Sequence, residues 1–158
     1  HSSRSTDFIT PKNAAARAYR DAVLELAEHH DFARPLVNSG RLSRPATLAG
    51  SPLNTADDAL WEGGVPPGAP AVDAPLEGGD WLLRRLQRGF TLLCTAPHPP
   101  VLGVEQVVFG GQTVLERYAM HPGEAVLFRP GQHVAGRWRH PTTAKIAAAR
   151  DRALGIGT

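Results

Sequence analysis

The sequence has a single cysteine, Cys94, among its 158 residues. An intramolecular disulfide and a Cys-x-x-Cys redox pair are therefore both excluded. Such low cysteine usage is typical of a compartment that keeps thiols reduced, so we expect a cytoplasmic location. Because Cys94 lies inside the apolar run "FTLLCTA" (residues 90–96), we interpret it as a buried thiol in a strand rather than as a nucleophile.

Long apolar runs and an excess of one charge are also absent. No run approaches the roughly 18 apolar residues that a membrane span needs. No charged-then-apolar signal peptide opens the chain. The net charge is only +2, and the arginines (Arg84-Arg85, and Arg137 alternating with Arg139) form no long basic stripe. We expect neither a membrane nor a nucleic acid as partner. Because the first residue is His1 and not Met, we expect a fragment or a processed chain.

Complete catalytic motifs are missing as well. The sequence has no Gly-x-Gly-x-x-Gly, no phosphate-binding loop with Gly-Lys-Ser/Thr, and no Gly-x-Ser-x-Gly. We interpret "FGGQT" (109–113) as a Gly-Gly turn with no helix after it. The carboxylates Asp57, Asp58 and Glu105 have no spacing that indicates paired acid–base catalysis. We therefore predict no catalytic and no cofactor-binding residue in this chain.

Metal binding is a weaker hypothesis. The stretch "RPGQHV" (129–134) is loosely similar to a histidine motif of cupins, but no His-x-His occurs in the chain. Ligands would have to converge from scattered turns. We predict no metal ligands, although four histidines are candidates: His98, His121, His133 and His140.

Residues 10–30 predict a helix. Thr10 is the expected N-cap and Pro11 suits the first helical position. Apolar residues recur at spacings of three and four and define one face: Ala15, Tyr19, Ala22, Val23 and Leu26. His29 and His30 fall at the helix end, where we expect them to be exposed or to cap it.

Residues 34–80 are rich in Pro and Gly and have no persistent period. They fit a linker or an ordered extended arm. Large apolar residues favour an arm that packs on a missing domain, on a partner subunit or on the C-terminal half. These residues are Leu36, Leu42, Leu48, Leu53 and Trp61.

The C-terminal half predicts a small α/β layer with a mixed sheet and a terminal helix. A helical turn is expected from Asp80 to Gly89. Strands are expected at 90–96, 104–111 and 113–120, followed by an antiparallel hairpin of 125–130 and 133–139. A helix from Pro141 to Gly155 closes the pattern.

Five stretches, in order, resemble the C-terminal portion of FAD-dependent aromatic-ring hydroxylases of the phenol hydroxylase and 3-(3-hydroxyphenyl)propionate hydroxylase type. They are "TPKNAAARAYRDAVLELA" (10–27), "FARPLVNSGRLSRP" (32–45), "PGAPAVDAPL" (67–76), "GFTLLCTA" (89–96) and "VLFRPGQHVAGRWR" (126–139). The resemblance covers essentially the whole chain.

The resemblance implies three parts. Residues 1–33 would hold the terminal helix of an otherwise absent FAD and substrate domain, 34–71 a connecting arm, and 72–158 a thioredoxin-like domain without its redox cysteines. Arg129 and Pro130 match the family's final hairpin, which implies a structural hairpin with His133 exposed or packed on the helix. Only seven residues, 97–103, separate the first two strands, so the first crossover helix of that domain is expected to be lost.

The family hydroxylates phenolic rings with FAD, O₂ and NAD(P)H, but the FAD-binding region is absent. The resemblance therefore implies a C-terminal fragment that is not catalytic alone, binds no cofactor itself, and serves in structure or dimerisation. Its partners would be the missing FAD-binding domain and a second copy, with Trp61, Trp81 and Trp138 as candidate contacts. The alternatives are a stand-alone degenerate thioredoxin-like interaction module and a small cupin-like metal protein.

Overall fold

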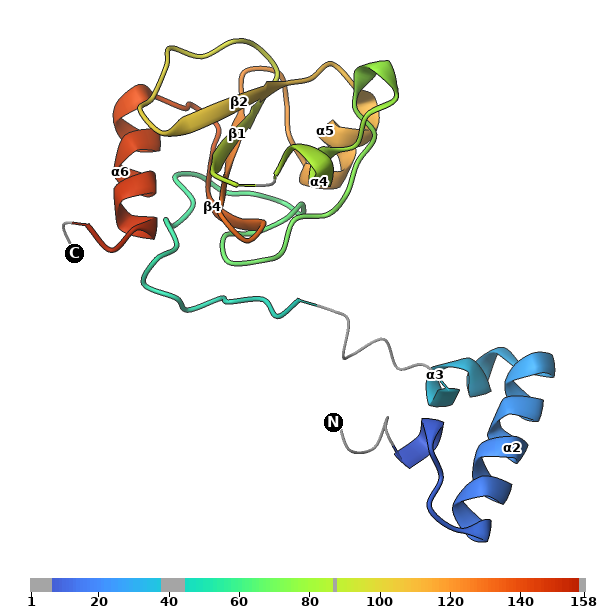
Figure 1. Cartoon of the computed structure of the whole chain (residues 1–158). Helices are drawn as coiled ribbons and strands as arrows, with labels where there is room; N and C mark the ends of the chain where they lie inside the picture. Colours follow the sequence, from blue (N-terminus) through green and yellow to red (C-terminus); the bar gives the residue numbers. More distant parts are fainter. Residues whose placement is uncertain (1–6, 38–44, 87, 157–158) are drawn as a thin grey trace. The chain divides into compact units, whose positions relative to one another are not determined.

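The computed structural model describes residues 7–37, 45–86 and 88–156. The chain forms two compact units, His1–Pro45 and Ala46–Thr158 (Figure 1). The predicted arm, 34–71, thus begins in the first unit and continues through the second. Within the described residues, no helix is both long and apolar enough to cross a membrane.

The first unit is helical. Helix α2 (Ala14–His29) is followed by the short helices η1 (Asp31–Ala33) and α3 (Arg34–Val37). The helix starts later than predicted: Asn13 is its N-cap and accepts a hydrogen bond from Ala16 N at 2.8 Å. Asn13 outcompetes Thr10 because a side chain caps only from the position directly before the first turn. His29 and His30 are exposed at its end, as predicted.

The predicted apolar face of α2 is mostly uncovered within this unit. Val23 is buried, with 5% of its surface exposed. Tyr19 and Leu26 expose 61% and 42% of their surfaces. Phe32 and Leu36, beyond the helix, are also exposed. This unit therefore has little core of its own.

The second unit is built on a mixed four-stranded sheet of order β2-β1-β3-β4. Its strands are β1 (Phe90–Cys94), β2 (Val104–Val108), β3 (Ala125–Arg129) and β4 (His133–Trp138). β1 pairs in parallel with β2 and antiparallel with β3, and β3 and β4 form the predicted antiparallel hairpin. The mixed sheet predicted from the sequence is therefore present.

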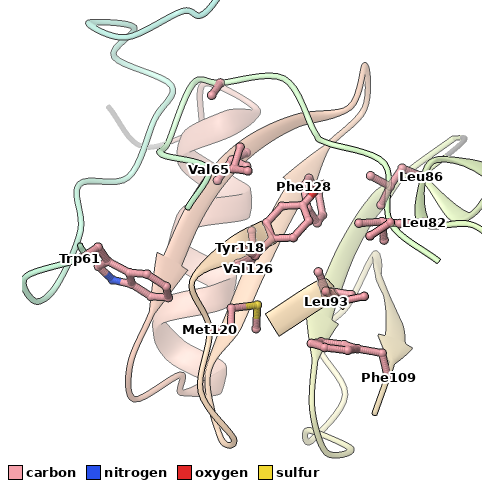
Figure 2. Close-up of a cluster of buried hydrophobic side chains, with 14 residues drawn as sticks. Trp61, Val65, Leu82, Leu86, Leu93, Phe109, Tyr118, Met120, Val126 and Phe128 are labelled. Atoms are coloured by element: carbon pink, nitrogen blue, oxygen red, sulfur yellow. The ribbon is translucent and has the colours of Figure 1, made fainter. Parts of the chain in front are cut away.

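Both faces of this sheet are covered, which explains the continuous apolar run of β1. One face packs on helix α6 (Thr143–Ala153) through Ile146 and Ala149. The other face lies under the arm, helix α4 (Leu82–Arg85) and helix α5 (Gln112–Tyr118). Figure 2 shows Tyr118 and Phe128 in the middle of this second core, with Trp61 at one end and Phe109 at the other.

Two connections differ in how well the sequence predicted them. No helix lies between the parallel strands β1 and β2, as the short connection led us to expect. The strand predicted at 113–120 is wrong, because this segment forms α5. Val114 and Tyr118 are buried at helical spacing and Gln112 bonds Glu116 one turn on, so burial on the sheet outweighs the β-propensity of Thr, Val and Tyr.

The part of the arm that the second unit contains lies along β4. Gly68 N donates to Val134 O at 2.8 Å, Val134 N donates to Ala69 O at 3.0 Å, and Ala71 N donates to Gln132 O at 2.7 Å. A register shift in the β3–β4 hairpin leaves Ala135 without a partner residue in β3. The carbonyl of Ala135 instead accepts a hydrogen bond from Thr55 N at 2.7 Å. The arm therefore supplies the hydrogen bonds that β4 would otherwise lack on its outer edge.

Helix α6 starts two residues later than predicted, at Thr143. Thr142 is the N-cap and its Oγ1 accepts from Lys145 N at 3.2 Å. Gly155 follows the helix with a positive φ of 72°, which suits glycine at a helix end.

Candidate binding pocket

Two guanidinium groups lie over the ring of Trp61, a residue of the arm. Arg137 lies 4.6 Å and Arg139 3.9 Å from the centroid of its ring. Because strand residues two apart point to the same face, the Arg137 and Arg139 alternation seen in the sequence delivers both cations to one side of β4. Cation–π contacts of this kind stabilise an arm–sheet junction when they are shielded from water.

Arg137 is itself held by the arm. Its Nε and Nη2 donate to the two carboxylate oxygens of Asp57 at 2.8 and 2.7 Å, and its Nη1 donates to Gly63 O at 3.0 Å. Its side chain is only 5% exposed, against 26% for Asp57. A buried guanidinium needs such a bidentate partner, because desolvation of an unpaired charge is costly.

Arg139 pairs with a different carboxylate, that of Glu124. Its Nη1 lies 2.6 and 2.7 Å from the two oxygens of Glu124, and Glu124 Oε2 also accepts from His121 N at 2.8 Å. A third ion pair, Lys145 Nζ to Asp58 Oδ2 at 2.6 Å, joins α6 to the arm. Asp57 and Asp58, for which the sequence indicated no acid–base role, thus serve as anchors.

A pocket of about 680 Å³ opens beside this cluster, between the arm and α5. Its apolar lining includes Leu115 and Met120. Arg139 also lines the pocket, but its positive charge is paired with Glu124. The two carboxylates of the lining, Glu62 and Glu116, therefore make the rim acidic. The pocket is therefore suited to a neutral or cationic group with an apolar part, and not to phosphates.

Two of the three candidate tryptophans pack inside this chain. Trp138 is 2% exposed in the core under α6, and Trp61 is 9% exposed in the cluster above. Trp81 is 40% exposed. Of the three, only Trp81 offers much surface to a partner.

The four candidate histidines have separate surroundings. His98 Nε2 lies 3.2 Å from Pro141 O, and His133 hydrogen-bonds Gly131 O and, at 3.1 Å, Ala46 O. His133 thus lies against the arm and not on the helix. His121 and His140 are exposed. In the described parts of the chain, no three His, Cys, Asp or Glu side chains come together in a group that could hold a metal ion.

Cys94 lies where the sequence placed it. Its side chain is buried in β1, and its Sγ is 3.9 Å from Val107 O. Burial raises the pKa of this thiol. The uncharged, inert form is therefore favoured.

The Gly110-Gly111 pair was wrongly interpreted as a turn without a helix, since α5 begins directly after it. A glycine pair between a strand and a helix is where a diphosphate such as that of FAD could bind, so we tested whether the residues around this pair fit one. A Cβ on Gly110 would lie 2.5 Å from Glu77 Oε1, so a carboxylate already covers this glycine. A second anion there would be repelled, and α5 has only 7 residues. The residues of this chain do not fit the diphosphate of FAD at that position.

The class of protein emerges from comparison with solved structures. Over most of its length the chain matches a portion of RebC, solved with reduced flavin, and of aklavinone-11 hydroxylase, solved with FAD, in structure. It spans only about 30% of the length of the first of these enzymes. No protein-family model matches the sequence, and no curated protein is similar to it by sequence.

Two of the matched enzymes are RebC and aklavinone-11 hydroxylase. RebC soaked with chromopyrrolic acid matches 92% of this chain with a TM-score of 0.60 and 25% identity, over 30% of its own length. The structure of RebC with reduced flavin, described as that of a rebeccamycin biosynthetic enzyme, matches 95% of this chain and 30% of its own. The TM-score is 0.60 and the identity 22%. Aklavinone-11 hydroxylase with FAD and aklavinone matches 66% of this chain and 25% of its own, with a TM-score of 0.50 and 19% identity. The last two matches support the fold alone.

Proposed function

We propose that this chain is the C-terminal portion of an FAD-dependent aromatic-compound monooxygenase, with a structural role and no catalytic activity alone. The observation that carries the proposal is the match of 92% of this chain to 30% of RebC at a TM-score of 0.60. The five sequence stretches that resemble aromatic-ring hydroxylases support it independently. A cytoplasmic location is part of the same proposal.

The second unit is, in this proposal, a thioredoxin-like domain that has lost its redox function. Its support is the mixed sheet, in which a parallel pair is followed by an antiparallel hairpin and a terminal helix. The chain has one cysteine, and it is buried. A dithiol mechanism needs two thiols, of which the attacking one is accessible, so this domain would serve as a packing module.

The first unit would contact the FAD domain of the same polypeptide. Its support is the uncovered apolar surface of α2 and the residues after it, where Tyr19, Phe32 and Leu36 are each more than half exposed. A surface of this kind marks an interaction site in a soluble protein. Residues outside this chain, including the FAD domain, would carry the chemistry.

The test is the coding sequence upstream of the codon for His1. We expect an open frame that encodes a strand–Gly-x-Gly-x-x-Gly–helix unit and a full-length protein that purifies with bound flavin. A start codon directly before His1 would overturn the proposal. So would tight FAD binding by the 158-residue chain alone, measured by flavin fluorescence titration.

The α2 contact can be tested separately in the full-length protein. We expect Leu26→Glu to lower its melting temperature, because a charge would be buried against the FAD domain. The same change in the 158-residue chain should leave unfolding nearly unchanged, since Leu26 is 42% exposed there. Glu25→Gln, on the same helix outside the apolar face, is the matched control.

A stand-alone interaction module is the second candidate. It is supported by the second unit, which buries its own core, arm included. A start codon directly before His1 and a protein partner that binds through the arm would favour it.

A further inference from the structure

Strand β2 forms an open edge of the sheet. It pairs only with β1, whereas the opposite edge, β4, is bonded by the arm (Figure 1). The other strands are almost fully buried, but every residue of β2 is half-buried or exposed. Val108 exposes 47% of its surface, and Leu102, just before the strand, exposes 87%.

The backbone groups that point away from β1 can be assigned from the ladder. Phe109 N donates to Cys94 O at 3.1 Å, so the odd-numbered residues of β2 bond β1. In a parallel pair alternate residues bond one neighbour, so Gln106 and Val108 direct both N–H and C=O outward. Val104 N is already used, by Val101 O at 3.1 Å. No described residue bonds the outward groups of Gln106 and Val108.

Natural edge strands are usually protected against pairing with another strand. Lysine, proline, a bulge or inward-pointing charge provides the protection. β2 reads "VEQVV", has no lysine or proline, and pairs with β1 without a register shift. Its one charge, Glu105, lies near the start of the strand. Nothing in β2 itself prevents a second strand from adding to it.

We propose that β2 pairs antiparallel with β2 of a second copy of this chain, on a two-fold axis at Val107. In this register Gln106 lies opposite the partner's Val108, and Val108 lies opposite the partner's Gln106. These are hydrogen-bonded pairs, so they satisfy the outward N–H and C=O groups of both residues in both copies. The two sheets become one continuous sheet across the dimer.

The sequence of β2 favours this register over its neighbours. A two-fold axis at Gln106 would place Val104 opposite the partner's Val108. Because the N–H of Val104 is already bonded to Val101 O, the carbonyl of that Val108 would have no donor. With the axis at Val107, the two Val107 side chains form a close apolar pair on one face. Glu105 lies opposite the partner's Phe109, and the two Glu105 residues are about 14 Å apart at roughly 3.4 Å per residue. No like charges meet.

This inference names a surface for the dimerisation that the sequence resemblance implies, and it rests on that role alone. It does not depend on the identity of the missing domain. The reading-frame experiment tests the parent enzyme, and the experiments below test the edge, so their failures are distinguishable.

Cysteine cross-linking tests the register in the full 158-residue chain with Cys94→Ala as background. We expect Val107→Cys to give a disulfide-linked dimer under mild oxidation, because a non-hydrogen-bonded antiparallel pair has the Cα spacing that a disulfide needs. Glu105→Cys is the matched control and should stay monomeric on a non-reducing gel. Cross-linking of both variants to the same extent, or of neither, would overturn the register.

Sedimentation equilibrium tests the edge itself. Val108→Pro removes an outward N–H and leaves the ladder to β1 intact, so we expect a folded monomer. Val108→Thr keeps the N–H and should dimerise like the unchanged chain. A circular dichroism spectrum equal to that of the unchanged chain shows that the proline variant is folded. A monomeric unchanged chain at high micromolar concentration, or a dimeric folded Val108→Pro variant, would contradict the proposal.

Discussion

The hydroxyl of Tyr118 and the peptide groups of Val72 bond in both directions. Tyr118 Oη donates to Val72 O at 2.7 Å and accepts from Val72 N at 2.9 Å. The ring is buried and meets Phe128 edge-on, with centroids 5.7 Å apart. One side chain thus replaces a strand partner for the arm where it leaves the sheet.

Tyr118→Phe should destabilise the second unit by about 1–3 kcal/mol, because the change leaves both backbone groups of Val72 without this partner. Urea unfolding followed by circular dichroism gives the free energy of unfolding. The matched control is Tyr19→Phe, which removes the hydroxyl of the chain's other tyrosine, 61% exposed in the first unit. An effect of Tyr118→Phe no larger than that of Tyr19→Phe would contradict this account.

Alkaline pH should weaken the fold through the same residue. Burial raises the pKa of Tyr118 well above its ordinary value of about 10. Between pH 10 and the raised pKa, the unfolded chain loses this proton while the folded chain keeps it. Stability should therefore be complete below about pH 10 and fall by roughly 1.4 kcal/mol per pH unit above it. Unfolding at several pH values should show a shallower decline for Tyr118→Phe.

The Asp57–Arg137 pair should be more costly to break than the Asp58–Lys145 pair. Asp57→Ala leaves the nearly buried Arg137 without its carboxylate, and we expect a loss of about 3 kcal/mol. Lys145→Met removes a pair whose lysine side chain is 42% exposed, and we expect less than about 1 kcal/mol.

The double variant Asp57→Ala with Arg137→Met should recover part of the loss. Thermal or urea unfolding of the unchanged chain, the two single variants and the double variant forms a double-mutant cycle. Strict additivity would show that the pair does not couple.

Gly64 and Gly63 allow crowding to be separated from backbone conformation. Both have positive φ, 69° and 84°. A Cβ on Gly64 would lie 2.3 Å from Tyr118 O, whereas a Cβ on Gly63 would meet nothing within 4 Å. Gly63→Ala should cost about 1 kcal/mol for the left-handed backbone alone. Gly64→Ala should cost at least about 2 kcal/mol more in the same unfolding assay, because the arm must move away from α5. Equal losses would count against the close approach.

Cys94 should react slowly with a thiol reagent in the folded chain and quickly in denaturant. Its side chain is buried, and burial raises its pKa, so little thiolate is present near neutral pH. Absorbance during reaction with Ellman's reagent measures both rates. Fast labelling without denaturant would show that β1 opens readily.

The sequence predicted the elements whose local pattern and burial agree. The β1 run, the hairpin at Pro130–Gln132 and helix α6 have an apolar pattern, a turn and caps that all favour one structure. Helix α5 was missed because it is short and its Thr113, Val114 and Tyr118 favour strands. The four-residue spacing of Val114 and Tyr118 was the one indication of a helix in the sequence. Only their packing on the sheet shows that both residues lie on the buried face of a helix.

The arm could be predicted only in part. Large apolar residues indicated that it packs on something, and Trp61 does. Leu36 and Leu48 are exposed, however, and Leu42 lies outside the described residues. Without a period, no pattern shows which residues turn inward. The partners of Trp61, such as Arg137, lie far along the sequence, so the site could not be assembled from local spacing.

The attachment of the arm to β4 sets an order for folding during synthesis. Asp57 and Arg137 are separated by 80 positions, and Thr55 bonds the carbonyl of Ala135. The ribosome makes the arm first, but its docking strand leaves the exit tunnel only after nearly the whole second unit has been made. Through that interval the arm lacks its contacts with β4, including the contact of Trp61 with Arg137. Long-range closure of this kind is slow and exposes apolar surface, so a growing chain would depend on chaperones at this stage.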